Sequence, residues 1–343
     1  MIVTRTVHQH WPWILFAAGF GLTILTLISL SFGAVNISPA ALMSLFSQQP
    51  DDLTQVIIFE LRLPRALLAL CVGAMLAASG AATQGLFRNP LADPSLIGVG
   101  AGAAAGASIV IVLVNAQQWS IAGLSIVTAG AFLGAIITVI LVYKIATGVH
   151  GTSVTTMLLT GIAMTFLAGS LSNVLEFLAD NEMLRRISLW RMGGLESADY
   201  SRVSIAFFVC VVVMILLPWH SSALNALLLG ESEARHLGID VNKVKRHLIF
   251  IVAAAVGTSV ALAGMISFIG LIVPHIVRLI VGPNHRYLIP LSALLGALLM
   301  VIADSFARTI IAPTELPVGI VTAILGAPVF ISLLLKRHQY GMQ

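Results

Sequence analysis

Long apolar runs, separated by short polar or charged breaks, follow one another along almost the whole chain. Runs of about 18 or more residues with few charges are typical of membrane-spanning helices. The breaks between them carry the Pro, Gly and Asn residues that often end helices. The pattern predicts about ten membrane helices. The predicted ranges are 13–32, 64–84, 96–114, 121–145, 153–178, 203–218, 248–265, 268–281, 287–306 and 317–335.

The first apolar run, 13–32, has the hydrophobicity of a signal peptide but is longer than a typical signal sequence. No clear small-residue cleavage site follows it, so we expect it to remain as the first membrane helix. The run at 268–281 is too short to cross a bilayer unaided and carries Pro274 and His275. No linker or internal repeat divides the chain, which predicts a single transmembrane domain over residues 1–343.

Composition favours an all-α integral membrane protein, a polytopic helical bundle rather than a barrel. Of the 343 residues, 58% are hydrophobic and 9% are charged, whereas about a quarter of the residues of a soluble domain are charged. The apolar runs are continuous, whereas barrel strands alternate apolar and polar positions. Glycines recur within the runs and favour close helix packing in lipid. Four of them are Gly102, Gly106, Gly130 and Gly134.

The net charge of +4 is explained better by membrane orientation than by nucleic acid. We therefore expect a surrounding lipid bilayer and no nucleic-acid partner. With ten spans and both termini in the cytoplasm, more of the Lys and Arg residues lie on the cytoplasmic side, as the positive-inside rule requires. The basic residues predicted on the opposite side are all arginines, which form bidentate pairs with carboxylates. They are Arg62, Arg65, Arg185, Arg186, Arg191, Arg202 and Arg308.

Three of these arginines are predicted to lie together just outside the membrane. Arg62 and Arg65 are three residues apart at the start of the second predicted helix, and Arg308 follows the ninth. They are candidates for binding acidic side chains of a soluble partner, and the alternative is anchoring to lipid headgroups. Asp304 precedes Arg308 by four residues, a spacing that predicts an ion pair at a helix end.

The polar stretch 227–240, LLLGESEARHLGID, predicts a short helix beside the membrane. Gly230 and Gly238 bracket it, and Glu231 lies in its first turn, where the helix dipole favours a carboxylate. We expect Ala234 and Leu237 to share one face. Such a helix suits contact with a cytoplasmic motor protein, and the alternative is an ordinary solvated loop.

Other classes of function lack the residues that they need. Cys71 and Cys210 lie within apolar runs, where we expect small buried hydrophobes and no disulfide. The histidines show no zinc-site spacing, so no metal site is expected. No phosphate-binding loop of the G-x-x-x-x-G-K type is present, so any ATP must be hydrolysed by another chain.

An ion-coupled secondary transporter would need carboxylates in mid-membrane, whereas Glu176 and Asp304 lie near the ends of predicted spans. A membrane enzyme would need a polar catalytic cluster within a span, and none is evident.

Five sequence blocks resemble one transport family in their wording and their order. They are LRLPR at 61–65, FRNPLADPSLIGV at 87–99, LGESEARHLG at 229–238, ALAGMISFIGLIVPHIVR at 261–278, and ELPVGIVTAILGAPVFISLLLK at 315–336. With these blocks the chain resembles the FecCD-type permeases of ABC importers for iron chelates, haem and cobalamin. The resemblance covers nearly the whole chain.

The resemblance implies a type II ABC importer permease fold in the bacterial inner membrane, working by alternating access. It implies a homodimer of permeases, two ATP-binding cassette subunits that carry ATP and Mg, and a periplasmic substrate-binding protein. No cofactor and no enzymatic activity are expected on this chain. Arg62, Arg65 and Arg308 correspond to the arginines that dock the binding protein. The residues corresponding to the coupling helix on the ATPase are Gly230, Glu231, Ala234, Arg235, Leu237 and Gly238. Those at the cytoplasmic gate of the pathway are Thr152, Ser153, Thr155 and Thr156.

The substrate class follows from finer likenesses within the same blocks. The wording of 85–99 resembles haem permeases more than siderophore permeases, and WRMGGL at 190–195 is also compatible with cobalamin permeases. We expect an iron complex, with haem ahead of a ferric siderophore, and cobalamin as the alternative. Arg185 and Arg186, near the predicted outer mouth, are candidates for contact with haem propionates.

Overall fold

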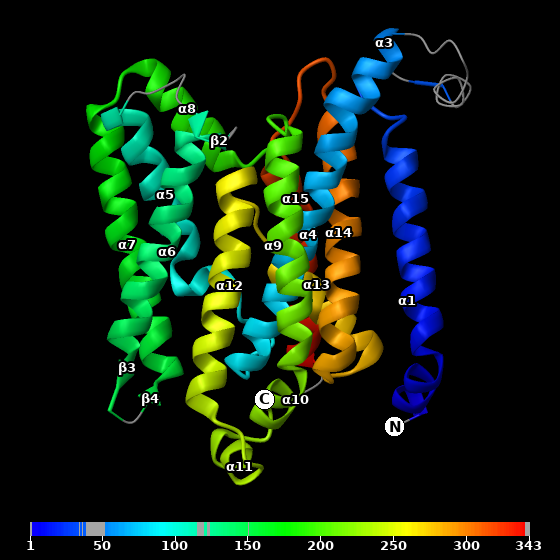
Figure 1. Cartoon of the computed structure of the whole chain (residues 1–343), viewed down its shortest axis with the longest axis vertical. Coiled ribbons are helices and arrows are strands. Elements are labelled where there is room, and N and C mark those ends of the chain that lie inside the picture. Colours follow the sequence, from blue (N-terminus) through cyan, green and yellow to red (C-terminus); the bar gives the residue numbers. More distant parts are fainter. Residues whose placement is uncertain are drawn as a thin grey trace.

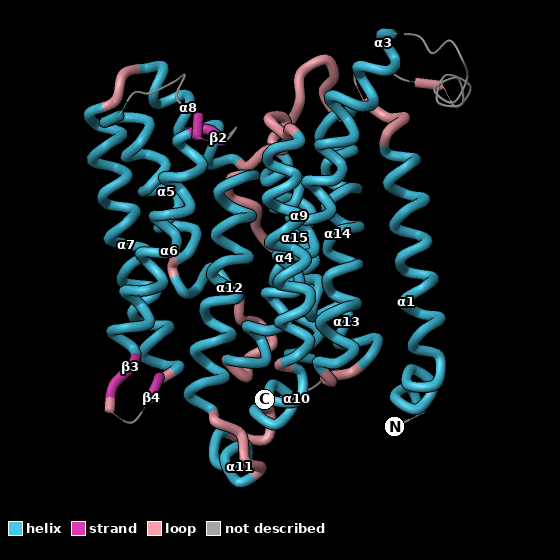
Figure 2. Tube along the Cα trace, viewed as in Figure 1, coloured by secondary structure: helices cyan, strands magenta, loops and turns pink. Residues whose placement is uncertain are grey.

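The computed structural model describes residues 2–33, 35, 37–38, 52–114, 120–121, 124–149 and 151–339. Long helices run up and down side by side, the hairpins lie at the two ends of the bundle, and some loops lie between the ends (Figures 1 and 2). The long and medium helices are α1 (Ile2–Ser29), α4 (Leu63–Leu86), α5 (Val99–Ile109), α6 (Ile126–Ala146), α7 (Val154–Leu178), α8 (Asn181–Met192), α9 (Tyr200–Trp219), α12 (Val241–Ala263), α13 (Ile269–Val281), α14 (His285–Thr309) and α15 (Val318–Gln339).

Short elements complete the chain. The short helices are α3 (Asp52–Gln55), α10 (Ser221–Leu227), α11 (Glu231–His236), the π-helical stretches η1 (Val56–Arg62) and η3 (Val110–Val114), and the 3₁₀ turn η2 (Pro94–Ile97). Two antiparallel hairpins join β1 (Ser120–Ile121) to β2 (Leu124–Ser125) and β3 (Thr147–Gly148) to β4 (Gly151–Thr152). In the second hairpin Thr147 lies opposite Thr152. The α8 end of the bundle holds α3, α8 and β2, and the α11 end holds α10, α11 and the β3–β4 hairpin (Figure 1).

The predicted set of membrane helices is confirmed within the described residues. Seven helices are long and apolar enough to cross a bilayer, and three shorter apolar helices accompany them. The shorter ones include α13, which the sequence marks as too short to span alone. The chain of helices α3, η1 and α4 is longer than predicted, because the apolar stretch Leu53–Leu86 is helical throughout.

Two further differences from the prediction have a local cause. The charged segment 180–202 contains α8, whose first turn is capped by Asp180 accepting from the backbone of Met183. Helix α12 begins at Val241, seven residues before its predicted start, because Asp240 caps it and accepts from the backbone of Lys243. An N-cap carboxylate satisfies backbone N–H groups that would otherwise be unpaired, so polar sequence that looks like a loop becomes helix.

Helix α4 forms the centre of the bundle and is buried along almost its whole length. It packs against α14, α9, α13 and α12. Its small residues allow close approach: a Cβ on Gly73 would lie 2.3 Å from the carbonyl oxygen of Gly296, and one on Gly80 only 1.8 Å from that of Gly270. Backbone-to-backbone packing of this kind stabilises helices in lipid, where no hydrophobic effect drives them together.

A second group, α5, α6 and α7, lies beside the first and is joined to it by α12 (Figure 1). Helices α5 and α6 meet through the glycines marked in the sequence. A Cβ on Gly106 would lie 2.1 Å from the carbonyl oxygen of Gly130, and one on Gly134 would lie 2.2 Å from that of Gly102. The predicted role of these four glycines in helix packing is therefore confirmed.

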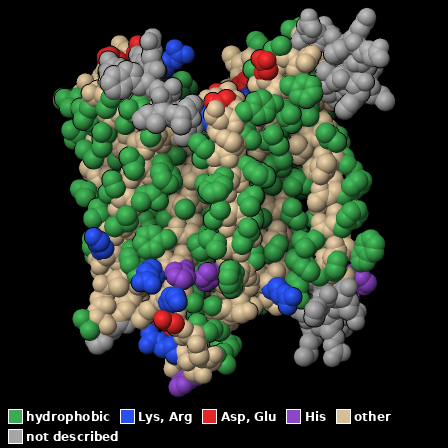
Figure 3. Space-filling view, viewed as in Figure 1, with side chains coloured by type: hydrophobic (Ala, Val, Ile, Leu, Met, Phe, Trp, Pro, Cys, Tyr) green, Lys and Arg blue, Asp and Glu red, His purple; other side chains and the backbone are tan. Residues whose placement is uncertain are grey.

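The visible face of the bundle carries large apolar side chains between its ends, with charged side chains gathered near the ends (Figure 3). Among the exposed apolar residues are Phe16 on α1, Phe166 on α7 and Phe208 on α9. Helix α1 is the least buried of the candidate spans. This distribution suits helices that face lipid or a second membrane protein.

Candidate functional site

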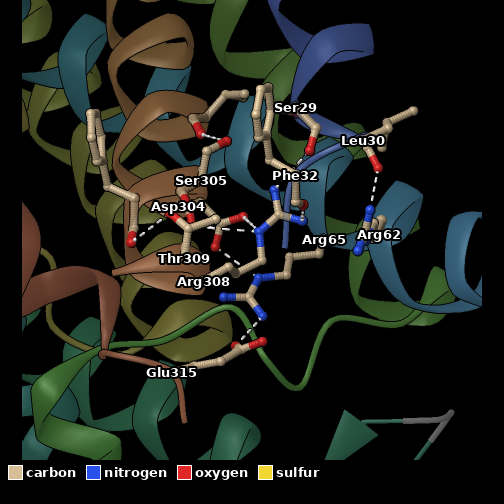
Figure 4. A network of polar contacts seen from close by, with 12 residues as sticks. Ser29, Leu30, Phe32, Arg62, Arg65, Asp304, Ser305, Arg308, Thr309 and Glu315 are labelled. Carbon is tan, nitrogen blue, oxygen red and sulfur yellow. Dashed lines mark hydrogen bonds and ion pairs between the residues drawn. The ribbon is translucent and has the colours of Figure 1, made fainter. Parts of the chain in front are cut away.

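At the α8 end, a buried carboxylate lies between two arginines that come from different helices (Figure 4). Asp304 Oδ1 lies 2.7 Å from Nε of Arg65, and Asp304 Oδ2 lies 3.1 Å from Nε of Arg308. The three side chains are between 1% and 9% exposed. Buried charges are stable only when they are paired, and here one carboxylate serves two guanidinium groups. The ion pair predicted between Asp304 and Arg308 is confirmed, and its extension to Arg65 was not predicted.

A second carboxylate reaches the same cluster from the loop between α14 and α15. Glu315 Oε2 lies 2.5 Å from Nη1 of Arg65, and the Glu315 side chain is 37% exposed. Arg65 thus bridges a fully buried carboxylate and one that water reaches. With Arg62 and Arg308, the cluster contains three cations and two anions, so it carries an excess positive charge.

The remaining contacts of the arginines hold the end of α1. Arg308 donates to the carbonyl oxygens of Ser29 and Phe32, both at 3.3 Å, and Arg62 donates to that of Leu30 at 2.6 Å. Arg62 also donates to the carbonyl oxygen of Val35. The last carbonyls of a helix lack partners within the helix, and cationic side chains satisfy them well. We call Arg62, Arg65, Asp304, Arg308 and Glu315 the arginine cluster, which ties α1, α4, α14 and the 315 loop together.

The arginines do not project from the surface as the sequence predicted. The exposed fractions of Arg62, Arg65 and Arg308 are 7%, 7% and 4%, because each side chain turns toward acceptors on neighbouring segments. The sequence predicts that Arg62, Arg65 and Arg308 lie together and that Asp304 pairs with Arg308, and the structure brings all four side chains to the α8 end of the bundle (Figure 4). The sequence misses Glu315 and the carbonyls of α1, since backbone acceptors leave no trace in the pattern of residue types.

Helix α8 bounds a cavity with charged and apolar lining residues at the same end. The cavity has a volume of about 590 Å³, and its lining includes Arg186, Trp190, Glu196 and Arg202. Arg186 is half-buried and pairs with Glu182 at 2.6 Å. Arg185 lies on the exposed side of the same helix. Of the two arginines predicted near the outer mouth, the structure therefore brings Arg186 to a cavity and leaves Arg185 on the surface.

At the opposite end, α11 confirms the predicted short helix. Glu231 and Glu233 lie in its first turn, and Gly230 and Gly238 flank it with positive φ angles of 133° and 83°. A positive φ favours glycine, because other residues are strained there.

The predicted shared face of α11 is wrong. Ala234 is fully buried, in a small cluster with Ala226, Leu227 and Val241, whereas Leu237 is 65% exposed. Leu237 already belongs to the C-terminal cap of α11, so it leaves the helical periodicity that the prediction assumed. Arg235 is exposed as well. The helix is fixed to the bundle by Ala234 and presents longer side chains outward.

The polar stretch that opens α7 has two roles in the structure. Thr152 is buried, and its Oγ1 lies 2.9 Å from Oγ1 of Thr147 across the β3–β4 hairpin. Ser153 caps α7 by accepting from the backbone of Thr156 at 3.2 Å. Ser153, Thr156 and the side chain of Thr155 are on the exposed side. Lys245 of α12 reaches this stretch and also α11, with its Nζ 2.8 Å from the carbonyl oxygen of Thr152 and 2.5 Å from Oε1 of Glu231.

In the part of the chain that the structure describes, no three His, Cys, Asp or Glu side chains converge as they would around a metal ion. Membrane-length helices, with charged clusters at both ends and apolar side chains between them, define a multi-span membrane protein. The chain belongs to the FecCD transport family, whose sequence pattern matches residues 21–336.

Similar proteins include permeases. The haemin transport system permease protein HmuU of Yersinia pestis is 39% identical to this chain, over 93% of this chain and 96% of that protein. The cobalamin import system permease protein BtuC of Halobacterium salinarum is 44% identical, over 84% of this chain and 75% of that protein. A solved structure described as an inward-facing metal-chelate type ABC transporter matches with a TM-score of 0.84 and 35% identity. That match covers 95% of this chain and 99% of the solved one. The predicted family and fold are both confirmed.

Proposed function

We propose that this chain is the membrane permease of an ATP-driven importer that carries an iron complex, with haem as the first candidate, from periplasm to cytoplasm. The observation that carries the proposal is the 39% identity to the haemin permease over 93% of this chain. The working assembly is a homodimer of this chain with two ATP-binding cassette subunits and a periplasmic binding protein. ATP and Mg are bound by the ATPase, and both termini of this chain face the cytoplasm of a bacterial inner membrane.

The orientation places the α11 end in the cytoplasm and the α8 end in the periplasm. The basic residues support it, since Arg235, Lys243 and Arg246 are exposed near the α11 end and cytoplasmic loops are rich in Lys and Arg. In this orientation α11 contacts the ATPase through Glu231, Arg235, Leu237 and the flanking glycines. Thr152, Ser153, Thr155 and Thr156 lie where the pathway narrows.

The arginine cluster is the docking site for acidic side chains of the binding protein. Its excess positive charge supports this role, because complementary charges steer and orient docking. Arg65 is the arginine through which docking begins, since its partner Glu315 is 37% exposed and a carboxylate of the binding protein can take its place. Arg62 and Arg308 add their positive charge from behind Arg65 while they keep their contacts with the end of α1.

The substrate passes between the two copies, and the cavity beside α8 lies near its entrance. Arg186 and Arg202 both line that cavity and supply positive charge for the propionates of haem, with Arg185 nearby on the surface. No chemical reaction on this chain is required. ATP binding closes the two ATPase subunits, and this closure moves α11 and alternates access to the pathway.

Cobalamin is the second candidate substrate. Its support is the presence of cobalamin and vitamin B12 permeases among the relatives, including the protein of Vibrio parahaemolyticus, which is 36% identical over 96% of this chain. An ion-coupled secondary transporter is disfavoured. Glu176 pairs with Arg191 at 2.6 Å and Asp304 with Arg65, which leaves these two carboxylates without the freedom to carry a coupling ion.

Transport in proteoliposomes tests the proposal. The permease is reconstituted with its ATPase and binding protein, and uptake of haem, a ferric siderophore and cobalamin is measured with and without ATP. We expect ATP-dependent uptake of haem above the other two. Uptake of cobalamin alone would replace the substrate, and uptake that needs no ATP would overturn the importer assignment.

A further inference from the structure

Lys245 is a buried lysine at the α11 end, and its ammonium group contacts two other segments. Its side chain is 3% exposed. Its Nζ donates to the carbonyl oxygen of Thr152 at 2.8 Å and to Oε1 of Glu231 at 2.5 Å. A lysine is rarely buried unless it is paired, and hydrogen bonds that involve a charged group are about twice as strong as neutral ones.

Each of the two acceptors stands at the start of a helix with a proposed role in transport. Glu231 is the first residue of α11. Thr152 ends strand β4, and Ser153, which follows it, caps α7. Both elements lie at the same end of the bundle as the first turns of α12 (Figure 1). One ammonium group therefore connects α11, α12 and the start of α7.

Two neighbouring contacts make the connection to α7 stiff. The Oγ1 atoms of Thr147 and Thr152 lie 2.9 Å apart and close the hairpin below α7. Gly151 packs so tightly against α12 that a Cβ there would lie 2.2 Å from Oδ1 of Asn242. Tightly packed groups transmit strain. A displacement of α11 that moves Glu231 and Lys245 therefore also displaces the hairpin.

We infer that Lys245 is a positioning residue that transmits the movement of α11 to the cytoplasmic end of α7, through Glu231 on one side and the backbone of Thr152 on the other. The inference rests on the proposed function, in which α11 contacts the ATPase and the start of α7 borders the pathway. Lys245 touches neither substrate nor nucleotide; it acts through the residues that it holds.

The first experiment separates transmission from assembly. Lys245→Met is reconstituted with the ATPase and the binding protein, and basal ATPase, stimulation by the loaded binding protein, and uptake are measured. We expect stimulation and uptake to fall about tenfold, the scale of one lost charge-assisted hydrogen bond, while basal ATPase changes by less than about twofold. Lys144→Met, which removes an exposed lysine at the end of α6, is the matched control and should behave as the unchanged protein.

Two further variants test whether Lys245 acts through its contact with Glu231. Lys245→Arg keeps the charge and the donors, and we expect it to retain more than about half of the stimulation. Adding Glu231→Gln to Lys245→Met should cause a smaller loss than Glu231→Gln causes in the unchanged protein, because the part of its effect that passes through Lys245 is already gone. Additive losses, or an equal fall of basal ATPase and stimulation in Lys245→Met, would mean that Lys245 serves assembly and would overturn the inference.

A distance measurement tests the same link without ATPase or substrate. Spin labels are placed by Val149→Cys at the fully exposed hairpin tip and by Ser232→Cys on α11, with Cys71 and Cys210 replaced by alanine. We expect one narrow distance distribution with Lys245 present, a broad one in Lys245→Met, and no change in Lys144→Met.

The two measurements fail in different ways. An unchanged distribution in Lys245→Met would sink the inference by itself. If the complete assembly with Lys245 intact imports no iron complex and no cobalamin, the proposed function fails. The distance measurement then still reports whether Lys245 joins α11 to the hairpin.

Discussion

The two ends of the bundle bury charge in opposite ways. At the α8 end, three arginines and two carboxylates form a closed cluster that fixes α1, α4 and α14. At the α11 end, one lysine joins two segments through single contacts, and its carboxylate partner is one-third exposed. A cluster with many partners resists displacement, whereas a single link moves with the elements that it joins. The comparison suggests an anchored end and a transmitting end.

The largest expected effect comes from breaking the centre of the anchored end. Asp304→Asn removes the carboxylate that contacts both Arg65 and Arg308, and leaves two guanidinium groups buried together. Removing one partner of a buried ion pair costs about 3–5 kcal/mol. We therefore expect the free energy of unfolding in detergent to fall by about that amount. Thermal unfolding followed by size-exclusion chromatography measures it. A change below about 1 kcal/mol would show that the cluster does not anchor the bundle.

Breaking the transmitting end should cost less stability. In Lys245→Met, the carbonyl of Thr152 loses its donor, but Glu231 can turn to water because its side chain is 33% exposed. We expect a loss of about 1–2 kcal/mol in the same unfolding assay. A cost equal to that of Asp304→Asn would remove the distinction between the two ends.

A change of Glu315, at the exposed edge of the arginine cluster, should affect docking of the binding protein more than the stability of the permease. Glu315→Gln releases Arg65 from a partly exposed carboxylate, and exposed pairs contribute about 1 kcal/mol or less. If the binding protein docks on Arg65, its affinity for the permease should rise severalfold, because an internal competitor is gone. Surface plasmon resonance measures the affinity. Glu182→Gln, a change in an exposed carboxylate on α8, is the control, and a weaker complex with Glu315→Gln would contradict this docking mode.

The smallest expected effect is at the surface of the α8 end. Arg186 and Glu182 are an i,i+4 pair, with side chains 30% and 67% exposed. Such pairs add about 0.3–0.5 kcal/mol, so Arg186→Gln should leave thermal unfolding nearly unchanged. If Arg186 meets haem propionates as proposed, haem uptake should fall while ATPase stimulation by the empty binding protein stays the same. A stability loss above about 1 kcal/mol would place Arg186 in the anchored set instead.

Much of the fold is present in the hydrophobic pattern. Apolar runs locate the seven candidate spans and three shorter apolar helices of the described residues, because each has to match the bilayer or the core. Gly106 and Gly130 mark where two of them touch. Helix α8 and the first turns of α12 escape prediction, since they depend on caps by Asp180 and Asp240 within polar sequence.

Among the candidate site residues, too, some contacts follow from the sequence and others depend on tertiary packing. The Asp304–Arg308 pair follows from helical spacing alone. Glu315 is close to Arg308 in sequence, yet its partner is Arg65, 250 residues away. Lys245 also escapes, because its burial depends on how α11 and the hairpin fold back onto α12. Contacts between distant segments, and contacts to backbone oxygens, are set by tertiary packing and not by residue type.

The two sides of the contact between the arginines and the end of α1 differ in how well they tolerate mutation. Arg62 and Arg308 bind main-chain oxygens of Ser29, Leu30, Phe32 and Val35, and every residue type supplies a main-chain oxygen. The exposed positions Phe32 and Val35 can therefore change their residues freely, whereas the two arginines cannot be exchanged without losing the contact. A library randomised at positions 32 and 35 should yield many folded permeases, and one randomised at 62 and 308 should return almost only arginine.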